Sequence, residues 1–68
     1  MRFEEAYKLM RRGEKIKLPE WGGYWYWDFH RQTIMIQLRQ GGVLDIRETS
    51  NVDYTFRFIC RDDWQVIE

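Results

Sequence analysis

The nine residues from Trp21 to Phe29 read WGGYWYWDF, and they hold half of the aromatic residues of this 68-residue chain. From Tyr24 onward the segment alternates in the way that side chains alternate along a β-strand. One face of that strand carries Trp25, Trp27 and Phe29, and the other carries Tyr24, Tyr26 and Asp28. The segment therefore predicts a central strand with aromatic side chains on both faces.

The two faces of the predicted strand are expected to contact different partners. The first is expected to form the core, with Trp25, Trp27 and Phe29 packed against Phe3, Tyr7 and Met10. The tyrosine face, together with Trp21 at a turn, has no evident partner inside so small a domain. It predicts either a subunit interface or a surface on which a nucleotide stacks, and the pattern favours neither. In the second case three arginines could contact phosphate: Arg31, Arg39 and Arg47.

The residues before the aromatic segment predict a helix and a first strand. Apolar side chains recur at the spacing of one helix face, at Phe3, Ala6, Tyr7 and Met10. Acidic residues open this segment, basic residues close it, and Gly13 follows it, as expected of a helix and its end. Lys15–Leu18 then alternates as a strand, which Pro19 ends or places at an edge.

The residues after the aromatic segment predict further strands. We expect a turn at 30–32, a strand over 33–39, a glycine hairpin at 41–42, a strand over 43–48 and a loop over 49–53. On the strand over 43–48, Leu44 and Ile46 are expected to point inward, and Asp45, Arg47 and Glu48 mostly outward. Residues 55–60 fit either a short strand or a helical turn, and 64–67 fit a final strand.

These elements predict an α+β fold, with one N-terminal helix packed on a small antiparallel sheet of about four to five strands. Residues 1–68 are expected to form a single domain. A chain this short buries only about 60% of the surface that its unfolded form exposes. Cys60 is the only cysteine, so no internal disulfide can add stability. We therefore expect a homo-oligomer.

Composition argues against two classes of partner. With 11 basic and 11 acidic side chains the formal net charge is zero, which disfavours a nucleic-acid polymer. No apolar run approaches the roughly 20 residues of a membrane span, and no signal peptide is recognisable. With a single unpaired cysteine, a cytoplasmic location is expected.

Few residues suggest catalysis or metal binding. His30 is the only histidine, and one histidine with one cysteine cannot supply a zinc site, so neither metal nor cofactor is expected. Asp62-Asp63 could form an acid–base pair or half of a metal site, but a loop or cap is the favoured interpretation. Gly22-Gly23 lacks the spacing of a phosphate-binding loop, although it would let a ligand approach the backbone. We therefore do not expect an enzyme.

The order of these features resembles a known family. The chain opens with MRFEEAYKLMRRGEKI, continues through Trp21-Gly22-Gly23, TIMI and GGVLDIRET, and closes with Asp62-Asp63-Trp64. Over essentially its whole length it resembles the Thoeris anti-defence two family of small phage and prophage proteins, long catalogued as a domain of unknown function. The specific part of the resemblance is the combination of the WGG turn with the DDW ending.

This resemblance implies a sponge without enzymatic activity. Members of the family assemble as homotetramers and sequester the cyclic ADP-ribose isomers that bacterial TIR-domain immune proteins make. Some relatives also capture cyclic dinucleotides. Their ligand pockets lie at subunit interfaces. The aromatic residues outside the core could therefore serve a subunit interface and a ligand at the same time.

Carried onto this chain, the resemblance implies a ligand-binding set of Trp21, Gly22, Tyr24, Trp25, Trp27, Arg47 and Asp63. Trp21 would stack on adenine and Arg47 would face a phosphate. Asp63 would accept a ribose hydroxyl or hold an arginine in place, and a structural cap is an equal alternative. The chain departs from the family pattern at Leu18-Pro19-Glu20, where many relatives have a basic residue, and at Arg61, where many have a small one.

The sequence thus predicts a phage-encoded, homotetrameric sponge that binds cyclic nucleotide immune signals in the host cytoplasm. Trp21→Ala is expected to abolish capture while leaving the oligomer folded. The alternative is a protein-interaction module that blocks a host protein through an exposed aromatic patch. An enzyme that degrades the signal ranks third.

Overall fold

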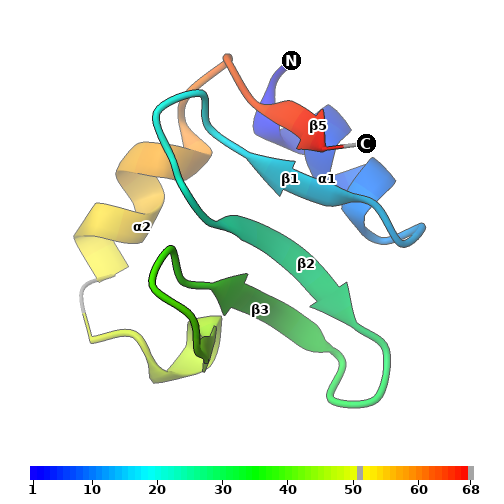
Figure 1. Ribbon diagram of the computed structural model, residues 1–68. Coiled ribbons are helices and arrows are strands. Elements are labelled where there is room, and N and C mark those ends of the chain that lie inside the picture. Colours follow the sequence, from blue (N-terminus) through cyan, green and yellow to red (C-terminus); the bar gives the residue numbers. More distant parts are fainter. Residues whose placement is uncertain (51, 68) are drawn as a thin grey trace.

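The computed structural model describes residues 1–50 and 52–67, in which helices lie beside an antiparallel sheet (Figure 1). The described elements are α1 (Phe3–Met10), β1 (Lys15–Lys17), β2 (Tyr24–Asp28), β3 (Thr33–Gln37), β4 (Val43–Asp45), the 3₁₀ turn η1 (Ile46–Glu48), α2 (Val52–Ile59) and β5 (Gln65–Ile67). Five strands are seen in these residues, in the order β4-β3-β2-β1-β5. The predicted α+β fold class is confirmed.

The aromatic strand β2 lies in the middle of the sheet. Trp25 pairs with Ile36 on β3 and with Ile16 on β1. Leu44 of β4 lies beyond Ile36, and Val66 of β5 lies beyond Ile16, so these side chains share one face. Helix α1 covers this face, and Ala6 and Met10 pack with Ile16 and Trp25 in the core.

Trp64 connects four parts of the fold. It is almost fully buried, and its ring lies 5.1 Å from Trp25 and 5.2 Å from Phe3. Its indole Nε1–H donates a hydrogen bond to the carbonyl of Phe58 at 3.1 Å, which attaches the end of α2. Its backbone N–H and carbonyl both pair with Met1, at 2.9 and 3.0 Å. The closing DDW motif therefore has a structural role.

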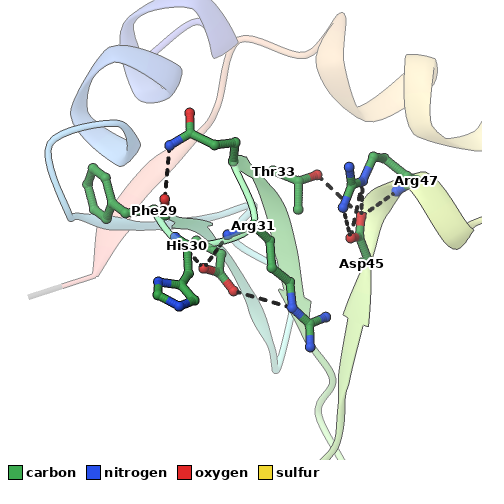
Figure 2. Close-up of polar contacts among 8 residues, drawn as sticks. Phe29, His30, Arg31, Thr33, Asp45 and Arg47 are labelled. Carbon is green, nitrogen blue, oxygen red and sulfur yellow. Dashed lines mark hydrogen bonds and ion pairs between the residues drawn. The ribbon is translucent and has the colours of Figure 1, made fainter.

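The prediction that Phe29 lies in the core is wrong. Strand β2 ends at Asp28, and Phe29 is 59% exposed. The Asp28 carboxylate accepts hydrogen bonds from the backbone N–H groups of His30 and Arg31, at 2.9 and 3.1 Å (Figure 2). This carboxylate starts the turn one residue earlier than the alternation indicates, so Phe29 leaves the sheet. His30 is exposed in this turn, as expected.

The predicted strand over 43–48 is also shorter, and Asp45 lies on the face opposite Leu44, as expected, but is buried there rather than exposed. Strand β4 ends at Asp45, which is only 4% exposed, and η1 follows it. The Asp45 carboxylate accepts hydrogen bonds from the Arg47 backbone at 2.8 Å and from the Thr33 hydroxyl at 3.2 Å (Figure 2). These bonds compensate its burial and end the strand. Strand β3 likewise ends at Gln37, two residues before the predicted boundary at Arg39, and Leu38 is exposed.

Residues 55–60 fall mostly in a helix, which settles the open alternative. Helix α2 begins at Val52, so the predicted loop over 49–53 is shorter than expected, and its residue 51 lies outside the described residues. None of the described α2 residues is buried, and Val52 and Phe56 are 60% and 57% exposed. Phe58 is the α2 side chain that packs on the core. No helix in the described part of the chain is long and apolar enough to cross a bilayer.

Candidate ligand-binding groove

A cavity of about 680 Å³ opens between α2 and the sheet, and we call it the aromatic groove. Its floor is Trp25, Ile36 and Leu44 on the face of the sheet that also carries the core. One wall is the β1–β2 loop (residues 20–23) with Tyr24 at the start of β2. The other walls are the end of β3 with the hairpin after it (residues 37–40), residues 48–50, and Tyr54, Thr55 and Phe58 of α2. The groove therefore forms where four segments distant in sequence meet.

Trp21 lies at the junction of this groove with the core. Its ring meets Phe58 edge to face at 4.9 Å and Trp64 edge to face at 5.3 Å. Trp25 lies 5.4 Å away at a tilt of 44°. The indole is half-buried among these rings, so Trp21 is a structural link between the loop and α2 as well as a groove residue.

The two glycines after Trp21 let the loop approach β3 and the hairpin closely. A Cβ on Gly22 would lie 2.7 Å from Cγ and 2.8 Å from Cδ of Arg39, so the aliphatic stem of Arg39 lies over Gly22. A Cβ on Gly23 would lie 2.0 Å from the carbonyl oxygen of Gln37. The space that a side chain would need is thus filled by the protein itself.

Arg39 is the one cationic side chain among the described residues that line the groove. No ion pair or hydrogen bond of its side chain is seen within residues 1–50 and 52–67. Its stem lies over Gly22, and Arg39 is among the residues that line the groove. Arginine presents several donors in a planar fork that fits phosphate or carboxylate oxygens. Arg39 can therefore supply the groove with an anion contact.

Arg47, the arginine expected to face a phosphate, lies outside the groove. Its guanidinium bonds the Asp45 carboxylate through Nη2 at 2.8 Å and through Nε at 3.2 Å (Figure 2). The side-chain and backbone hydrogen bonds from Arg47 lower the pKa of Asp45 to about 2. Arg47 is thereby occupied in stabilising a buried carboxylate.

Asp63 also lies outside the groove and holds an arginine, one of the two roles expected of it. Arg61 donates through Nε to Asp63 at 2.9 Å, and its Nη2 also contacts this carboxylate. The same guanidinium contacts both carboxylate oxygens of Glu20, which is 41 residues away in sequence. The hydrogen bonds from Arg61 lower the pKa of Asp63 and of Glu20.

The groove thus unites four of the seven expected ligand-binding residues, namely Trp21, Gly22, Tyr24 and Trp25. Trp27 lies elsewhere, against α1, with the Arg11 guanidinium 4.1 Å from its ring centre and Tyr7 at its edge. Sequence reasoning missed Tyr54 and Phe58, although their four-residue spacing was a usable helical signal. The sequence named Arg39 only as one of three arginines that could contact a phosphate.

The remaining candidate groups lie away from the groove. Among the described residues, no three His, Cys, Asp or Glu side chains lie close enough to hold a metal ion. Cys60 is exposed beyond the end of α2, and His30 is exposed in the β2–β3 turn. Neither residue lines the groove.

No protein-family model, curated protein or solved structure matches this chain in comparisons with known proteins.

Proposed function

We propose that this protein is a phage anti-defence sponge that binds a cyclic nucleotide immune signal in the aromatic groove and does not cleave it. The observation that carries the proposal is that several aromatic side chains line one cavity together with Arg39, for which no ion pair is seen among the described residues. A nucleotide presents the matching chemistry, because it joins a flat base to a phosphate. Cyclic ADP-ribose isomers are the first candidate ligands, and cyclic dinucleotides are the second.

The dimensions and chemistry of the groove support this proposal. Its volume of about 680 Å³ lies within the roughly 300–1,000 Å³ that small-molecule sites occupy. A base that stacks on an aromatic side chain gains about 1–3 kcal/mol. Tyr54, on the exposed side of α2, and the accessible part of Trp21 offer such surfaces. A phosphate on Arg39 would add a charge-assisted contact.

The ionisable groups of the groove support capture rather than cleavage. Of the two carboxylates among its described lining residues, Glu20 is held by Arg61, and the pKa of Glu20 is lowered. A carboxylate with a lowered pKa is a poor proton donor near neutral pH. The other carboxylate is that of Glu48, and the described residues that line the groove include no histidine or cysteine. We therefore propose that the protein binds its ligand without turnover. We also propose that it acts in the cytoplasm of the host cell.

We further propose that the working form is a homo-oligomer, with a tetramer as the leading candidate. The exposed apolar side chains of α2, Val52 and Phe56, support this proposal because a second copy could cover them. Native mass spectrometry with and without cyclic ADP-ribose would test it. A monomer under both conditions would contradict it.

Calorimetry with cyclic ADP-ribose isomers and with cyclic dinucleotides tests the proposed function. Arg39→Gln is expected to weaken binding by about tenfold or more, since one lost charge-assisted contact costs about 1.5–3 kcal/mol. Arg31→Gln is the matched control, because Arg31 is exposed in the β2–β3 turn and pairs with Asp28 at 3.9 Å. The absence of binding by the wild-type protein to either class of ligand would contradict the sponge.

One observation favours a second candidate, a protein-interaction module. Val52 and Phe56 lie one helical turn apart and are both exposed, which suits docking against another protein. The protein would be incubated with signal-containing lysate and heat-denatured, and the supernatant assayed for intact signal. Release of intact signal supports the sponge. No release, together with co-purification of a host protein that Phe56→Ser abolishes, supports the interaction module.

A further inference from the structure

Glu20 and Arg61 lie 41 residues apart in sequence and contact each other in the fold. Glu20 belongs to the β1–β2 loop and lines the aromatic groove directly before Trp21. Arg61 follows α2, and its side chain is about one third exposed, at 35%. The guanidinium of Arg61 meets the Glu20 carboxylate through Nη1 and through Nη2, the latter at 3.1 Å. An ion pair therefore joins the β1–β2 loop to the segment that follows α2.

This interaction joins the two walls of the groove. One wall is the β1–β2 loop, and the other is α2, none of whose described residues is buried. At the end of α2, Phe58 packs on Trp21, and its carbonyl accepts a hydrogen bond from Trp64. The ion pair adds a charged contact just beyond this end, between Arg61 and the β1–β2 loop.

We propose that the Glu20–Arg61 pair is a latch that holds α2 against the β1–β2 loop and so sets the width of the aromatic groove. Asp63 is the positioning residue for this latch, because it binds the Nε side of Arg61 and orients the guanidinium toward Glu20. An isolated surface ion pair contributes little, but an arginine held in a two-pronged contact on each side is geometrically restricted. Arg61 thereby makes the groove a site of fixed size.

Amide hydrogen exchange of the ligand-free protein tests the latch. Glu20→Gln and Arg61→Gln are each expected to speed exchange in α2 by about 1.5-fold to fivefold, the range for losing one partly exposed ion pair. The double variant is expected to be no faster than Arg61→Gln alone, because that change already removes the pair with Glu20. Exchange in β2 and β3 is expected to keep its wild-type rate.

Two further variants separate the latch from a general loss of stability. Arg57→Gln removes an exposed pair with Asp53 at 3.4 Å on α2 itself and is the matched control. Arg61→Lys retains the charge without the fork and is expected to restore α2 protection only in part. Unchanged α2 exchange in Glu20→Gln, or equal acceleration in α2 and in β2, would overturn the latch.

The consequence for ligand choice rests on the proposed function. With a fixed width, the wild-type groove is expected to discriminate between cyclic ADP-ribose and a larger cyclic dinucleotide, and Glu20→Gln should change the ratio of the two affinities at least threefold. An unchanged ratio would overturn this role in selectivity. If the wild-type protein binds neither ligand, the proposed function fails, while α2 exchange still decides whether the latch exists.

Discussion

Gly23 and Gln37 approach so closely that a methyl group on Gly23 would lie 2.0 Å from the Gln37 carbonyl oxygen. This approach brings the β1–β2 loop against the end of β3, where both line the aromatic groove. The second glycine of the WGG turn is therefore required by backbone packing rather than by a ligand. The neighbouring Gly22 meets only the flexible stem of Arg39.

This difference predicts opposite outcomes for two adjacent substitutions. Gly23→Ala is expected to destabilise the fold by about 1–3 kcal/mol or more, because the backbone of β3 must move. Gly22→Ala is expected to retain the wild-type stability, because Arg39 can change rotamer, but to weaken ligand binding by displacing its guanidinium. Urea denaturation and calorimetry on both variants check this, and equal stabilities would contradict it.

Trp21→Ala is expected to destabilise the protein as well as to impair binding. The indole packs edge to face on Phe58 and Trp64, so its removal leaves a cavity beside the core. For a half-buried tryptophan we expect a loss of about 2–3 kcal/mol, below the roughly 3–5 kcal/mol of a fully buried one. Trp21→Phe, which keeps an aromatic ring, is the better variant for binding studies. Thermal melts of both variants test this order.

The Asp45 carboxylate predicts a loss of stability at low pH. Its pKa falls from an ordinary 3.8 to about 2 in the fold, chiefly through the side-chain hydrogen bonds of Arg47. A lowered pKa gives stabilisation that is complete above the unfolded value and is lost as pH falls from about 4 through about 2. Arg47→Gln should flatten this part of the curve of unfolding free energy against pH. Arg57→Gln, on an exposed pair, should leave the curve unchanged.

Trp64→Phe is expected to loosen α2 without dismantling the sheet. The variant keeps the ring packing on Trp25 but loses the Nε1–H bond to the Phe58 carbonyl. The expected loss is about 1–2 kcal/mol, from one hydrogen bond and a small cavity. Faster amide exchange in α2 than in β2 would support this expectation. Wild-type exchange throughout would show that the bond contributes nothing.

Patterns over a few neighbouring residues correctly predicted the helix and strand that such patterns determine. The spacing of Ala6 and Met10 predicted α1, and the alternation around Trp25 predicted β2 with its buried face. The errors at Phe29 and Asp45 share a cause. In both places an aspartate carboxylate binds backbone N–H groups shortly after it and ends a strand that alternation alone would extend.

The site was predictable only in the part that is continuous in sequence. Trp21, Tyr24 and Trp25 lie in one short segment and therefore reach one cavity together. The wall that contains Phe58 depends on how α2 packs against the β1–β2 loop. No short pattern in a single sequence encodes this long-range packing. The partner of Arg61 is equally distant, since Glu20 lies 41 residues before it.

The place of β5 in the sheet has a consequence for the order of folding. Strands β2, β3 and β4 are neighbours in sequence and can pair through short turns, whereas β1 must wait for residues 65–67 before its outer edge is filled. Closing such a long loop costs more entropy than forming the hairpins. On the ribosome, the β2–β4 meander can therefore assemble while the groove still lacks its second wall. The groove is completed when α2, which follows the meander in the chain, packs on the β1–β2 loop.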